Sequence, residues 1–149
     1  MDHAAPSLNR LALSATTHCL TGCAIGEVLG LVMATQLGWH DIPAIALAIV
    51  LAFVFGYGLT VQPLLSSGIA VRAALGLAFA ADTISITVME IVDNAIVVLI
   101  PGAMAAGITD ALFWGSLALS LIVAGLVAFP VNRWLIARGR GHAVMPGHH

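Results

Sequence analysis

The first side chains that could do chemistry lie in one short segment, T-H-C-L-T-G-C-A-I-G-E, from Thr17 to Glu27. If this segment is helical, with about 100° between consecutive residues, Cys19, Cys23 and Glu27 fall on one stripe. His18 flanks the other edge of the same broad face. Glycines lie between these residues and would let a neighbouring helix approach closely. The stripe is therefore expected to face another helix.

A second group lies in the segment D-T-I-S-I-T-V-M-E-I-V-D-N, from Asp82 to Asn94. A helix here would place Asp82, Met89, Glu90 and Asp93 on one face. This face again collects the carboxylates, with a thioether among them.

Depths counted along the two helices at about 1.5 Å per residue predict that these groups form two layers. Glu27 and Glu90 would share one layer near the middle of the helices. His18, Cys19 and Asp82 would share a second layer nearer the helix N-termini.

The ligand types favour a metal ion. Thiolate, imidazole and thioether ligands suit copper(I) and also zinc, whereas carboxylates are harder ligands that suit iron, manganese or zinc. Copper is therefore the favoured cofactor, with zinc or iron as alternatives. The predicted metal-site residues are His18, Cys19, Cys23, Glu27, Asp82, Met89, Glu90 and Asp93.

Structural roles remain open for the same side chains. Cysteine and methionine also serve as packing residues in protein interiors, and buried acids can form a polar network that fixes helix register. Asp82 could be solvated near a membrane interface. The neighbouring hydroxyl groups of Thr83, Ser85 and Thr87 are expected to bond backbone carbonyls of their own helix. Asn94 is expected to hydrogen-bond across helices.

Composition places these segments in a membrane protein. The chain has 149 residues, of which 60% are hydrophobic and 8% charged, and it has no lysine. Soluble domains carry roughly 25% charged residues, so a surface made from this chain could not face water. Five arginines against seven acids exclude the basic surface of a nucleic-acid-binding protein. Two cysteines are too few for a disulfide scaffold.

Four apolar stretches are long enough to cross a bilayer, which needs about 20 helical residues. The sequence predicts an all-α, integral membrane four-helix bundle over residues 11–137. A cytoplasmic N-terminal segment (1–10) would precede it, and a His-containing cytoplasmic tail (138–149) would follow. The third stretch would be about 48 Å long, so it must be tilted, broken or protruding. The predicted spans are Leu11–Trp39, Ile42–Leu65, Ile69–Ile100 and Ala111–Ile136.

All the arginines fall at one end of this layout. Arg10 precedes the first span, Arg72 follows the loop between the second and third, and Arg133, Arg138 and Arg140 lie at the end of the fourth. The two opposite loops contain no arginine. The positive-inside rule therefore predicts that both termini are cytoplasmic.

Longer motifs carry a family resemblance. The two segments above, with L-A-F-V-F-G-Y-G-L-T, P-G-A-M, F-W-G-S-L-A-L and P-V-N-R-W-L-I-A-R-G-x-G-H-A, resemble a family of small bacterial membrane proteins classed as a domain of unknown function. The resemblance covers residues 17–143. It implies a four-helix domain in the bacterial inner (plasma) membrane. It also implies a link to copper, because some members are labelled copper oxidase or lie near copper-handling proteins.

Three functions follow from these observations. The leading one is a metal-binding membrane protein for copper handling or a membrane-embedded metal centre, with copper-handling proteins as possible partners. The alternative is a small proton- or cation-coupled transporter or channel subunit, because buried acids on facing helices mark ion paths. It would act as a homo-oligomer, which the glycines of the first span would help to build. A thiol–disulfide enzyme is disfavoured, because cysteines four apart on a helix suit a shared metal better than a relaxed disulfide.

Overall fold

The computed structural model describes residues 7–138, which form four long α-helices and one short 3-10 turn. The all-α four-helix prediction is confirmed, and each predicted boundary lies within three residues of the observed one. The histidines of the predicted tail lie outside the described residues. The elements are α1 (Leu8–Leu37), α2 (Ile42–Ser66), α3 (Val71–Leu99), η1 (Ala103–Ala105) and α4 (Ala111–Ala137).

The ends of α1 follow local capping rules. Ser7 has an extended backbone, and its hydroxyl accepts a hydrogen bond from the backbone N–H of Arg10, which satisfies one of the free donors at the helix start. At the other end Gly38 adopts a left-handed conformation with a φ of 70°, which glycine reaches without a Cβ clash. The chain then turns tightly into α2.

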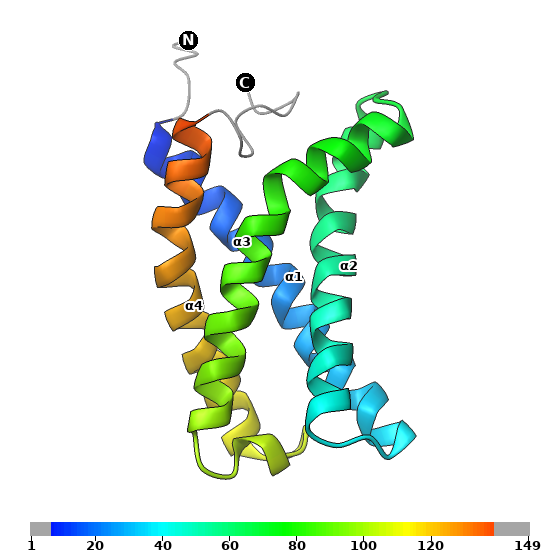
Figure 1. The fold of residues 1–149 in the computed structure, drawn as a ribbon, viewed down its shortest axis with the longest axis vertical. Coiled ribbons are helices and arrows are strands. Elements are labelled where there is room, and N and C mark those ends of the chain that lie inside the picture. Colours follow the sequence, from blue (N-terminus) through cyan, green and yellow to red (C-terminus); the bar gives the residue numbers. More distant parts are fainter. Residues whose placement is uncertain (1–6, 139–149) are drawn as a thin grey trace.

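The helices run alternately up and down, so α1 and α3 are parallel to each other and antiparallel to α2 and α4 (Figure 1). α1 crosses the bundle obliquely and contacts all three other helices. Its start packs beside the end of α4, where Ala12, Ala15 and Ile136 form a small buried cluster. α1 and α3 are therefore the two helices from which side chains can reach every other helix.

The interior of the bundle is built from small and polar side chains, and the large apolar side chains face outward. Alanine is the most frequent residue in the buried core, and Ser85, Asp93 and Ser120 are all completely buried. Large side chains such as Ile42 and Leu99 are more than three quarters exposed. Helices that pack in lipid use small residues at their contacts, because the surrounding medium is as apolar as leucine. All four helices are long and apolar enough to cross a membrane.

α1 and α2 touch backbone to backbone along one row of small residues. Gly22 and Gly26 of α1 lie against Gly56 and Ala52 of α2, and Gly30 continues the row. A Cβ atom added at Gly26 would lie 2.5 Å from the backbone nitrogen of Ala52, so no larger residue fits. We call this row the glycine seam. These glycines were expected to help build an oligomer, and in the structure they pack against α2 of the same chain.

α3 is bent (Figure 1). The predicted third span was too long to cross a bilayer as one straight helix, and the bend accounts for the extra length. Its first third turns away from the bundle axis and stays beside the end of α2 (Figure 1). There, Ala74 and Ala81 pack against Leu64 of α2. The remainder of α3 descends through the centre of the view, between α4 and α2, with α1 behind it (Figure 1).

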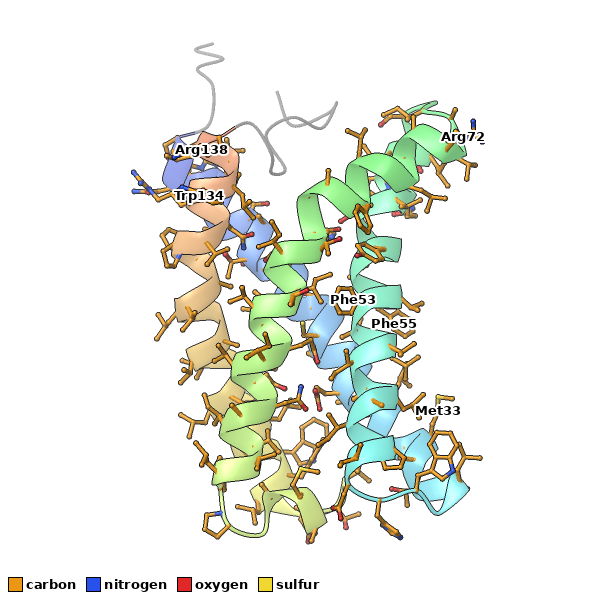
Figure 2. The ribbon with its side chains drawn as sticks, viewed as in Figure 1. Met33, Phe53, Phe55, Arg72, Trp134 and Arg138 are labelled. Atoms are coloured by element: carbon orange, nitrogen blue, oxygen red, sulfur yellow. The ribbon has the colours of Figure 1, made fainter. Side chains whose placement is uncertain are left out.

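Arginine side chains gather at one end of the molecule. Figure 2 shows Arg72 at the start of α3 and Arg138 after α4 at the same end, and Met33 near the opposite end. The Arg138 guanidinium lies 5.2 Å from the centroid of the Trp134 ring, a distance at which a cation attracts an aromatic face. We call this the arginine end.

Candidate functional site

Three acidic side chains from two helices meet inside the bundle. Glu27 of α1 interacts with both Asp93 and Glu90 of α3. Asp93 is completely buried, Glu90 is 3% exposed and Glu27 is half-buried. We call Glu27, Glu90 and Asp93 the carboxyl cluster.

Each acid of the carboxyl cluster keeps one buried oxygen without a hydrogen-bond partner among the described residues: Glu27 Oε1, Glu90 Oε1 and Asp93 Oδ2. The other oxygen of Asp93 accepts a hydrogen bond from the Ser120 hydroxyl of α4. The other oxygen of Glu90 accepts one from Asn94 Nδ2 at 3.2 Å. Buried polar atoms almost always find a partner, so three unpartnered oxygens in one cluster mark a place where something else can bind.

Positive charge is remote from the carboxyl cluster. The chain has no lysine, and the arginines of residues 7–138 are all exposed and belong to the arginine end. A buried carboxylate without a cationic partner carries a large desolvation cost. A proton or a cation bound at the cluster would remove that cost.

Sulfur atoms continue the polar column from the carboxyl cluster toward the arginine end. Cys23 interacts with Glu90, and its Sγ lies 4.0 Å from Met89 Sδ. One turn further, Ser85 donates a hydrogen bond to Cys19 Sγ at 3.4 Å. Both cysteines are free thiols and are completely buried.

The column is regular because both helices contribute every fourth residue. Cys19 meets Ser85 and Cys23 meets Met89, and the next step along both helices brings Glu27 to Asp93. Rows of residues four apart are ridges of a helix surface, and two such rows interlock when the helices cross obliquely. The oblique path of α1 in Figure 1 has this geometry.

A hydrogen-bonded bridge joins three helices at the top of the column. His18 Nε2 of α1 lies 2.6 Å from Thr60 Oγ1 of α2, and Thr60 donates to Asp82 Oδ2 of α3 at 2.5 Å. Thr60 is 3% exposed and Asp82 is completely buried. We call these residues the His–Thr–Asp bridge.

The glycine seam determines which residue meets His18. His18 lies four residues before Gly22, and Thr60 lies four residues after Gly56, so the bridge is the next contact along the seam. The close backbone approach that the glycines allow is what brings a short threonine side chain within reach of the imidazole.

The predicted metal-site residues are thus divided between two layers, as the depth count predicted. His18, Cys19 and Asp82 belong to the upper layer, because Asp82 also interacts with Cys19. Glu27 and Glu90 belong to the lower one. Within residues 7–138, no three or more histidine, cysteine, aspartate or glutamate side chains form a group that could hold a metal ion.

Two predicted hydrogen bonds are wrong and two are confirmed. Ser85 bonds the thiol of Cys19 instead of a backbone carbonyl, and Asn94 bonds Glu90 of its own helix instead of a neighbouring helix. Thr83 and Thr87 do bond carbonyls one turn back in α3.

Sequence reasoning missed the hydroxyl groups that the other helices contribute. Thr60 and Ser120 each bond a buried aspartate, and Ser116, one turn from Ser120, has a buried hydroxyl without a partner among the described residues. A usable signal existed for Thr60, since it continues a row of small residues spaced by four that includes Gly56 and Ala52.

Residues 9–141 match the model of a family described as a domain of unknown function, DUF4396, and this span covers most of the chain. No curated protein and no solved structure matches the chain.

Proposed function

We propose that this chain, which belongs to the DUF4396 family, is an integral membrane protein that binds and passes protons or small cations through its carboxyl cluster, as a small transporter or channel subunit. The observation that carries the proposal is the set of unpartnered, buried oxygens on Glu27, Glu90 and Asp93. Ionisable groups inside a membrane bundle are costly and mark ion or proton paths. Location in a bacterial plasma membrane with both termini cytoplasmic is part of the same proposal.

The arrangement of the donors supports a proton as the main ligand. No group of three or more histidine, cysteine, aspartate or glutamate side chains placed to hold a metal ion is found among the described residues. A proton needs only one or two oxygens, whereas hard metal ions need about six. A carboxyl group that gains a proton can donate to the neighbouring acid, so Glu27 and Asp93 could share one.

Glu90→Gln tests the proposal, because it keeps the shape of the side chain and removes the exchangeable proton. The purified full chain is placed in vesicles that contain a pH-sensitive dye, and a potassium diffusion potential drives proton entry. Proton flux should fall about a hundredfold in this variant, at the lower end of what a proton-transfer group contributes. Asp41→Asn, an exposed acid between α1 and α2, is the matched control and should keep the wild-type flux.

The same vesicles separate protons from other ions. Flux of labelled sodium without proton flux would mean that the transported ion is a cation such as sodium and not a proton. No flux of either ion would contradict the proposed function. Because the glycine seam is occupied within the chain, any oligomer needed for the pathway would use a different face, which crosslinking in the same vesicles would identify.

Copper(I) binding is the second candidate, and the sulfur pair favours it. Metal–sulfur bonds of about 2.3 Å allow one ion between Cys23 Sγ and Met89 Sδ, which lie 4.0 Å apart. Thiolate and thioether ligands select copper(I). Copper, zinc, iron and manganese would be measured in protein purified without a metal-affinity step and reconstituted under reducing conditions. Bound copper that is lost in Cys23→Ser would favour a copper protein, and a wild type free of all four metals would remove this candidate.

A further inference from the structure

We propose that the His–Thr–Asp bridge is the proton entry relay of this protein, and that the Thr60 hydroxyl carries protons from His18 to Asp82. The inference deepens the proposed function and rests on it, since the relay would supply the carboxyl cluster. The bridge lies at the arginine end of the polar column, one turn or less from the first thiol.

The first step is access from the surface. An open groove runs along α1 from the arginine end and is lined by Arg10, Leu13, Ser14, Thr17 and His18. His18 is therefore the residue that both lines the groove and contacts the interior. It lies about 12 Å from Arg10 along the helix axis, and its side chain is half-buried.

The second step is the direction of the hydrogen bonds. Thr60 donates its hydroxyl proton to Asp82, so its oxygen is left to accept from His18 Nε2. A hydroxyl group has one donor and two acceptor positions, and the bridge uses one of each. The chain of bonds thus points from the groove toward the interior.

The third step is the transfer itself. Protonated His18 gives its Nε2 proton to Thr60 Oγ1 while Thr60 gives its own hydroxyl proton to Asp82 Oδ2. His18 becomes neutral, Asp82 becomes a carboxylic acid and the hydroxyl is restored, so one proton has moved from α1 to α3 without a free ion. Among the described residues near the bridge, Arg10 lines the same groove as His18, and Cys19 interacts with Asp82.

The onward path follows the column already described. Ser85 lies one turn below Asp82 on α3 and bonds Cys19, and the next rung holds Cys23 beside Glu90. Polar hydrogen-bonding groups therefore occur at each turn of α3 between the bridge and the carboxyl cluster. In this proposal, protons pass from the relay to the carboxyl cluster along one path.

Thr60→Val and Thr60→Ser form the test pair. Valine keeps the shape of threonine and lacks the hydroxyl, whereas serine keeps the hydroxyl. In the vesicle assay, proton flux should fall about tenfold or more in Thr60→Val, and Thr60→Ser should restore most of it. Recovery by serine separates a relay from a packing role, because serine is the smaller residue and packs less well at this buried position.

A second measurement follows proton arrival at Asp82 directly. A rapid drop in external pH is applied, and the carboxylic acid C=O band of Asp82, assigned with Asp82→Asn, is followed by infrared spectroscopy. The band should appear promptly in the wild type and in Thr60→Ser, and about tenfold more slowly in Thr60→Val.

The outcomes separate the relay from the proposed function. Wild-type flux in Thr60→Val, or a prompt Asp82 band in that variant, would overturn the relay and leave the carboxyl cluster as the proton site. A delayed band in Thr60→Val without proton flux in any sample would support proton delivery by the bridge and overturn transport.

Discussion

At the scale of single residues, the interior is organised by which polar atoms have partners and which do not. Asp93 accepts a hydrogen bond from Ser120 at one oxygen, and its other oxygen has no hydrogen-bond partner among the described residues. The first holds the side chain in place and the second leaves it able to bind. A neighbouring pair of serines on α4 separates these two roles experimentally.

Ser120→Ala should destabilise the protein and Ser116→Ala should not. Ser120 is the donor to Asp93, so its removal leaves a second buried acceptor unpartnered, at a cost of about 1–3 kcal/mol. Ser116 has a buried hydroxyl without a partner among the described residues, and alanine in its place removes a desolvation cost. Thermal unfolding of both variants in detergent gives the comparison. Equal losses would mean that Asp93 does not depend on Ser120.

Asp93→Asn should abolish proton flux while leaving the fold intact. The amide keeps an oxygen that can accept from Ser120 and gains a donor that can reach Glu27, so the buried pair is satisfied without an ionisable group. We expect the free energy of unfolding to stay equal or to rise by about 1 kcal/mol. Asp93→Ala is the contrast and should lower it. If Asp93→Asn is as unstable as Asp93→Ala, the Asp93 carboxylate is needed for folding and not for proton transport.

At the scale of the helices, α1 contacts α2 and α3 through two adjacent rows of its residues. One row, which includes the glycine seam, lies against α2, and the row one residue further along lies against α3. The first row sets how closely α2 approaches, and the second places sulfur and carboxyl groups in the interior. One edge of α1 therefore serves close packing, and the neighbouring edge carries the side chains that could do chemistry.

Gly26→Ala should destabilise the bundle, whereas Gly58→Ala should be neutral or slightly stabilising. The added methyl at Gly26 would meet the backbone of Ala52 at 2.5 Å, and nothing lies within 4 Å of one added at Gly58. Forcing an extra carbon into a packed contact costs about 1–3 kcal/mol, and alanine in an open helical position gains up to about 1 kcal/mol over glycine. Unfolding in detergent measures both. Equal behaviour of the two variants would contradict the glycine seam.

The sequence predicted the faces of individual helices well, because a face depends only on the angular spacing of residues along one helix. Glu27 and Asp93 were placed on the correct faces in this way, and the two layers followed from the rise per residue. The partners across helices were not predicted. Thr60 and Ser120 are ordinary hydroxyl residues in apolar stretches, and their roles depend on which helices become neighbours, which periodicity does not specify.

At the scale of the whole molecule, the fold has polar ends and an apolar outer surface around a polar column. Arginines gather at one end, large apolar side chains cover the outside, and the carboxyl cluster and Asp82 lie within. This distribution supports the proposal that the protein crosses a membrane with the arginine end in the cytoplasm.

Single-cysteine labelling checks this orientation. Ser67→Cys lies in the exposed loop between α2 and α3, and Thr109→Cys lies in the exposed loop before α4. The native thiols are completely buried, so they should give little background. A membrane-impermeant maleimide added to intact cells should label Thr109→Cys, and should label Ser67→Cys only after the membrane is opened. The reverse labelling pattern would mean that the protein has the opposite orientation in the membrane, and that protons reach the relay from the opposite side.

The two adjacent rows of α1 also bear on how a gene for this chain can change. A codon inserted or deleted between His18 and Gly26 would turn the rest of the helix by about 100°. An insertion would move Gly26 to the position that faces α3, and a deletion would bring Glu27 into the close contact with α2. Substitutions on the outward face leave both rows intact. We therefore expect selection in this family to act more strictly on the length of α1 than on the identity of its outward-facing residues.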